Sequence, residues 1–141
     1  MKRMAIVFAV LAAVSPAAAD VRIASAIDAT RSTVIDRAHN TATLRRTLAR
    51  VSSQFSSKNA QLDATIVGLT VESIDDLVVV NARVRIAISN PDGRIVSMLT
   101  SNARAEKSAR VFRPRHLRAM RDDAVIAAVQ GAVDKAKLAA R

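Results

Sequence analysis

One stretch of the chain, from Arg104 to Arg121, has residue types that could bind anions. Within 18 residues it holds seven basic side chains and a single acid, Glu106. The planar guanidinium group of arginine makes two-point hydrogen bonds to phosphate and carboxylate groups. The segment therefore predicts a surface that contacts lipid headgroups, an anionic envelope polymer or an acidic protein. The residues expected to make this contact are Arg110, Arg113, Arg115, Arg118 and Arg121.

The alternative interpretation of this segment is a solvated loop and helix start in an arginine-rich chain. Of the 20 basic residues that follow position 19, 16 are arginine, so the whole chain prefers arginine to lysine and the segment is not unusual in this respect. Against a purely stabilising role, cations at the start of a helix meet the partial positive charge of its free N–H groups. Both interpretations are compatible with the sequence.

The other ionisable residues have spacings that favour structural roles. The acidic pairs Asp75–Asp76 and Asp122–Asp123 are sequence neighbours, whereas acid–base catalysis needs two carboxyl groups that face one site. His39 and His116 have no cysteine or acidic cluster beside them, so no metal site is predicted. His116 lies among cations, which should resist its protonation.

No motif indicates an enzyme or a cofactor. The serines lack GxSxG and SxxK contexts, and three glycines cannot build a phosphate-binding loop. We therefore expect a non-enzymatic protein without a cofactor. The alternative is a small exported hydrolase or enzyme subunit, in which distant acids such as Asp63 and Asp92 converge. Nucleic acid is not an expected partner, because only Phe55 and Phe112 after residue 19 could stack on bases.

The first 19 residues predict export. Lys2 and Arg3 precede an unbroken apolar run, Met4 to Val14, and the small residues Ala17 to Ala19 follow. This order is typical of a secretory signal peptide, here cleaved after residue 19. The run is shorter than the roughly 20 residues that cross a bilayer, so no transmembrane span is expected. Residues 20–141 should form one periplasmic or extracellular domain, without the cysteine that a disulfide or a lipid anchor needs.

Strands are predicted in the middle of the chain. Apolar and polar residues alternate from Leu77 to Ser89, as in a strand with one buried face. The turn sequence 90–93, Asn-Pro-Asp-Gly, leads into a second strand at Arg94 to Arg104. An earlier strand, Leu62 to Val71, completes an antiparallel meander of three strands. The meander has four strands if Ala109 to Phe112 adds an edge.

Helices are predicted on both sides of the meander. Residues 20–58 have mainly helical spacing, which allows one helix, two helices broken at 39–41, or a strand at 21–24 followed by a helix. Residues 114–140 predict a long helix whose apolar face needs the sheet and either the N-terminal helix or a partner chain to cover it. Its small residues Ala124, Ala128 and Gly131 allow close approach. Its surplus face around Val125, Val129 and Val133 could serve self-association.

The expected fold is therefore α+β, with an antiparallel meander and helices packed on one face. This plan resembles the α/β domains of bacterial envelope assembly factors. The resemblance, together with the export signal and the basic segment, implies a binding or assembly module of the cell envelope.

Overall fold

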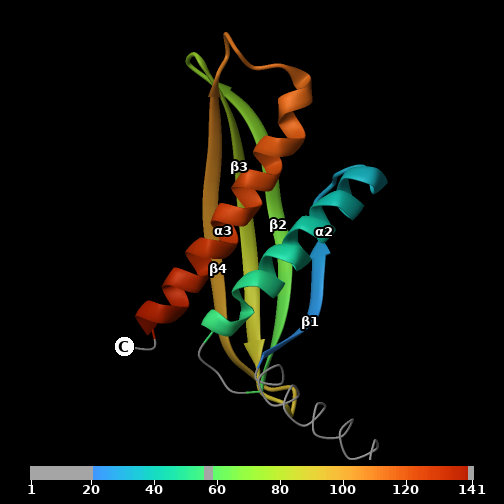
Figure 1. Ribbon diagram of the computed structural model, residues 1–141, viewed down its shortest axis with the longest axis vertical. Helices are drawn as coiled ribbons and strands as arrows, with labels where there is room; N and C mark the ends of the chain where they lie inside the picture. The colour runs from blue at the N-terminus through green and yellow to red at the C-terminus, as the bar shows by residue number, and fades with distance from the viewer. Residues whose placement is uncertain (1–20, 56–58, 140–141) are drawn as a thin grey trace, which may run out of the picture.

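Two helices cover one face of a four-stranded sheet in the computed structural model (Figure 1). The model describes residues 21–55 and 59–139, so the predicted signal peptide and most of the loop predicted at 56–59 lie outside the described residues. The strands lie in the order β1-β2-β3-β4, and β1 and β4 form the edges. The elements are β1 (Val21–Asp28), α2 (Val34–Val51), the 3-10 turn η1 (Ser52–Gln54), β2 (Ala60–Ile74), β3 (Leu77–Ser89), β4 (Ile95–Ser108), the 3-10 turn η2 (Pro114–His116) and α3 (Leu117–Ala139).

The antiparallel meander β2–β3–β4 confirms the predicted α+β fold. In β3, whose bounds are those predicted, Val84 and Ile86 are fully buried under the helices, and Arg85 between them is exposed on the open face. Both flanking strands are longer than predicted, because polar residues such as Glu72 and Lys107 still pair with β3. Residues 109–112 form a turn and not the fourth strand considered above.

The fourth strand is β1, which runs parallel to β2 with Val21 opposite Ala60. Parallel neighbours need a crossover connection, and α2 provides it. Of the three arrangements predicted for residues 20–58, a strand followed by a helix is the observed one. The helix break predicted at 39–41 is wrong. The helix α2 continues through these residues because Asn40 is buried and bonded to Asp28 at the end of β1.

The long helix α3 packs on β3 and β4 and lies beside α2 (Figure 1). Val125, Val129 and Val133 are buried inside this chain, so they are not available as the self-association surface suggested by the sequence. The close approach predicted at Gly131 is confirmed, since a Cβ atom there would overlap the Ser101 hydroxyl on β4. Within residues 21–55 and 59–139, no helix has the length and apolar character needed to cross a membrane.

The two helices run in the same direction. Arg121 near the start of α3 lies 3.7 Å from Asp36 near the start of α2. Near the other end of α3, the Lys137 ammonium group donates a 2.9 Å hydrogen bond to the Gln54 side chain, just beyond the end of α2. Both helices therefore begin at the same end of the molecule, in the upper part of Figure 1.

Candidate functional site

The basic segment forms the end of the molecule where α3 begins, at the top of Figure 1. After β4 the chain turns sharply, because the Phe112 amide donates a 3.0 Å hydrogen bond to the Ser108 carbonyl. The Ala109 amide donates to the Asp76 carbonyl at 2.8 Å, which ties this turn to the hairpin between β2 and β3. Pro114 then opens η2, which leads directly into α3.

Four of the five predicted arginines are exposed at this end. Arg110, Arg115 and Arg118 form no ion pair in the part of the chain that the structure describes. Arg113 is also exposed, but its Nη1 atom folds back and donates to the Phe112 carbonyl at 2.7 Å. The first turn of α3 contains no acidic residue. These arginines therefore neutralise little of the negative charge within their own fold.

The fifth predicted residue, Arg121, has a structural partner. Its side chain is about one-quarter exposed and contacts Asp36 on α2, so it joins the two helix starts. Sequence spacing placed it with the other four arginines, but it lies on the part of α3 that faces α2. Arg121 is therefore less available to an external anion than the others.

Besides Asp36 and Glu106, two more carboxylates lie at the same end and offset part of the positive charge. Asp75 and Asp76 form the exposed turn between β2 and β3, where Asp75 has a positive φ of 54°. Aspartate is among the few residue types that tolerate this left-handed conformation. These two residues therefore have a backbone role, in agreement with their turn position in the sequence.

His116 closes the turn that carries the arginines. Its Nδ1 atom accepts a 3.0 Å hydrogen bond from the Arg113 amide, so this nitrogen carries no proton. Partial burial lowers the pKa of His116 from its ordinary value of 6.5, and the positive charges of Lys107, Arg115 and Arg113 lower it further. The predicted resistance of this histidine to protonation is thereby confirmed.

We expect this turn to open progressively as the pH falls below 6.5. With a folded-state pKa below 6.5, the folded protein binds fewer protons than the unfolded chain between the two pKa values. The contribution of the neutral imidazole to stability is therefore complete above pH 6.5 and is lost as the pH falls through that interval. Amide hydrogen exchange at Arg113, followed between about pH 8 and pH 5, should show decreasing protection. In His116→Phe, protection should be low and independent of pH, and the same profile in both proteins would contradict the prediction.

A polar network joins α2 and α3 below the arginines. The His39 Nε2 atom lies 2.9 and 3.0 Å from the two carboxylate oxygens of Asp122, although the residues are 83 positions apart in sequence. The Thr43 hydroxyl donates to the same carboxylate at 3.0 Å. In a catalytic triad the hydroxyl would bond to the imidazole, whereas here both groups bond to the acid. This network therefore holds the helices together without positioning a nucleophile on His39.

A second polar network is buried at the end of β1. Asp28 is 4% exposed and accepts hydrogen bonds from the Asn40 amide at 2.9 Å and from the Thr30 backbone at 2.8 Å. The Thr30 hydroxyl donates to the same carboxylate, and the Thr41 hydroxyl accepts from the Asp28 amide. These bonds fix the end of β1 against the middle of α2.

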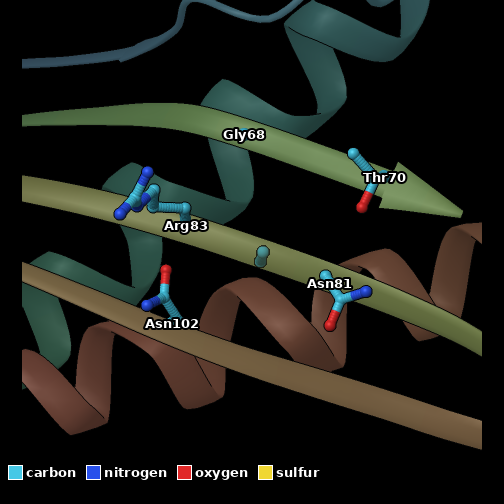
Figure 2. A pocket seen from close by; sticks show the side chains of 6 residues that line it. Gly68, Thr70, Asn81, Arg83 and Asn102 are labelled. Carbon is cyan, nitrogen blue, oxygen red and sulfur yellow. The ribbon is translucent and has the colours of Figure 1, made fainter.

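A shallow groove of about 290 Å³ lies on the open face of the sheet. Figure 2 shows the side chains of Thr70, Asn81, Arg83 and Asn102 projecting from three strands on the face away from the helices. No acid, histidine or serine lines it. The acids considered for an enzyme are bonded elsewhere, Asp63 to the Ser25 hydroxyl and Asp92 to the Arg94 amide. Within the described ranges, no group of three His, Cys, Asp or Glu side chains could hold a metal ion.

The fold resembles that of one solved bacterial protein, and two further solved proteins match with lower scores. One is a candidate lipoprotein from Caulobacter crescentus CB15, with a TM-score of 0.53 and 13% sequence identity over 84% of this chain and 85% of that chain. Two others have a TM-score of 0.47 and 13% identity. They are a minor lipoprotein from Acinetobacter baumannii, with 83% of this chain and 92% of that chain covered, and the hypothetical protein CT253 from Chlamydia trachomatis, with 85% and 94% covered. No protein-family model matches the sequence, and no curated protein matches it.

Sequence reasoning missed the two polar networks. His39 and Asp122 lie 83 positions apart, and neither has a neighbour in sequence that suggests a partner. One signal was present in α2, where Asn40, Thr43 and Thr47 recur at helical spacing on the face that also carries Leu44 and Leu48. Polar residues on the buried face of a helix need bonding partners from other elements. That pattern indicates a polar contact but does not identify the partner.

Proposed function

We propose that this protein is an exported, non-enzymatic binding module of the bacterial cell envelope, and that its arginine-rich end contacts an anionic partner. One observation carries the proposal. Arg110, Arg115 and Arg118 are exposed together at one end and have no carboxylate partner among the described residues. Guanidinium groups that are free in this way can make paired hydrogen bonds to phosphate or carboxylate groups of another molecule.

The position of these arginines disfavours a purely structural role. Arg115 and Arg118 lie at the start of α3, where the free N–H groups of a helix already carry partial positive charge. The nearest acid on that helix, Asp122, is bonded to His39 and Thr43 of α2. The cations therefore reduce the stability of the helix start, and an external anion would relieve the repulsion.

Export is supported by the N-terminal sequence and by the fold. The order of charge, apolar run and small residues in positions 1–19 is that of a secretory signal peptide. The Caulobacter protein with the same fold is described as a candidate lipoprotein, a class of proteins attached to membranes of the envelope. The present sequence contains no cysteine, the residue that carries the lipid of a lipoprotein. The arginine-rich end would provide contact with the envelope through its own side chains.

The proposal is tested with protein purified after export from a bacterial host. The triple variant R110E/R115E/R118E should bind phosphatidylglycerol vesicles and soluble polyglutamate at least about a hundredfold more weakly than the wild type, because each cation near an anionic surface contributes about 1 kcal/mol. Arg113 is left unchanged because its side chain is bonded to the turn. Binding is measured by vesicle co-sedimentation and by titration calorimetry.

The matched control is R45E/R50E/R94E, which makes the same change in net charge at exposed positions on α2 and beside the β3–β4 turn. This control should retain most of the binding. Equal losses in the two triple variants would show that net charge matters and the arginine-rich end does not. A wild-type protein that binds neither anionic probe would also reject the proposal.

A further inference from the structure

The arginine-rich end also exposes aliphatic side chains. Val111 lies in the turn between Arg110 and Arg113 and is 57% exposed. Its backbone is fixed by a hydrogen bond from the Val111 amide to the Ser108 carbonyl at 3.1 Å. The turn thus holds an apolar side chain outward between two cations.

The start of α2 exposes two more aliphatic residues. Val34 and Ile35 are 72% and 73% exposed, the largest values among the exposed large hydrophobic residues. The next residue, Asp36, contacts Arg121, which places this helix start beside the start of α3. Neither residue is needed to form the helix, because β-branched residues are indifferent helix formers and Thr33 already caps α2.

We propose that this end of the molecule docks on an anionic lipid bilayer, with Val111, Val34 and Ile35 entering the boundary between headgroups and acyl chains. The inference rests on the proposed function and names the anionic partner. The arginines on either side of Val111 and at the start of α3 contact lipid phosphates, and their apolar stems follow the boundary. Apolar side chains combined with surrounding cations are the two features that bind a protein to the surface of an anionic membrane.

The shape of the end favours a bilayer over an acidic protein. The aliphatic residues project from a turn and from a helix start, so each can enter a soft interface without a fitted pocket. A stable protein interface instead has a closely packed core, often with aromatic residues. Among the described residues, this end offers a single Phe, Tyr or Trp side chain, the partly buried Phe112. The groove in Figure 2, which could hold a side chain of a partner protein, lies on the open face of the sheet and not at this end.

The test uses the absence of tryptophan and tyrosine from the chain. A tryptophan introduced as V111W or as I35W is the sole fluorescent reporter of its site. With phosphatidylglycerol vesicles, both variants should show a blue-shifted emission and reduced quenching by aqueous acrylamide. With phosphatidylcholine vesicles the shift should be absent, and high salt should reverse it because it screens exposed charges. The control M98W places tryptophan at a site on β4 that is also half-exposed, and its quenching should not change.

A second variant separates the contribution of the aliphatic side chains from that of charge. V34S/I35S/V111S keeps every arginine and should bind anionic vesicles about tenfold more weakly, since apolar area no longer enters the boundary. Its binding to soluble polyglutamate should equal that of the wild type. Circular dichroism of each variant checks that the fold is kept.

The outcomes distinguish the inference from the proposed function. If V111W and I35W remain open to acrylamide while the arginines still bind both anionic probes, the bilayer inference is rejected and the proposed function stands. Binding to polyglutamate without binding to vesicles would identify an acidic protein as the partner and would also reject the bilayer. If R110E/R115E/R118E has no effect on either probe, the proposed function fails and the inference fails with it.

Discussion

Asp28→Ala should destabilise the protein by about 3 kcal/mol, because it removes the acceptor from a buried polar network. The carboxylate of Asp28 is almost fully buried and accepts bonds from Asn40 and Thr30. Asn40 is itself 2% exposed, so its amide group would lose its partner in a place that water does not reach easily. The cost therefore includes the unsatisfied donors as well as the lost bonds.

Urea unfolding followed by circular dichroism measures this effect. The matched control is Asp92→Ala, which removes a carboxylate that accepts the Arg94 amide at 3.0 Å in an exposed turn. Water can replace that acceptor, so the control should lose less than about 1 kcal/mol. Equal losses in the two variants would show that the Asp28 network is not a special source of stability.

Gly131→Ala should also destabilise the protein, by about 1 to 2 kcal/mol, although alanine forms helices better than glycine by about 1 kcal/mol. The added Cβ atom would overlap the hydroxyl of Ser101, which is 3% exposed and has little room to move. Either α3 must shift away from β4 or the serine must change its rotamer. The loss of packing then outweighs the gain in helix propensity.

The double variant S101A/G131A tests this explanation. Without the hydroxyl, the new Cβ atom would lie 3.6 Å from the Cβ of residue 101, which is an ordinary van der Waals contact. The double variant should therefore recover the loss and exceed the stability of the single variant S101A by about 1 kcal/mol. If S101A and G131A have additive effects, the two residues do not restrict one another, and the close contact is not the cause.

The sequence predicted the meander better than the first half of the chain. The bounds of β3 follow from the apolar residue at every second position and from two turn sequences that flank it. The strand β1 was harder to distinguish, because Ile23 and Ile27 have a spacing that also fits a helix. Its strand form depends on parallel pairing with β2, which comes after α2 in the sequence. Local spacing contains no information about such a distant partner.

The candidate site was predicted in composition and only partly in arrangement. The arginines from 110 to 118 lie close in sequence around one turn, so they had to remain close in space. Arg121 is one helical turn further, and its role depends on Asp36, which comes from another helix. The helix α2 buries Leu44 and Leu48, whereas Val34 and Ile35 in its first turn are exposed.

The parallel course of α2 and α3 has a consequence for how the molecule would approach a charged surface. In an antiparallel pair the electrostatic effects of the two helices nearly cancel at a distance, whereas here they add. The exposed arginines lie at the same end, so their charges act beside the partial positive charges of both helix starts. An anion that reaches this end would therefore meet both helix starts and the arginines at once. This local attraction would weaken as ionic strength rises, because salt screens exposed charges.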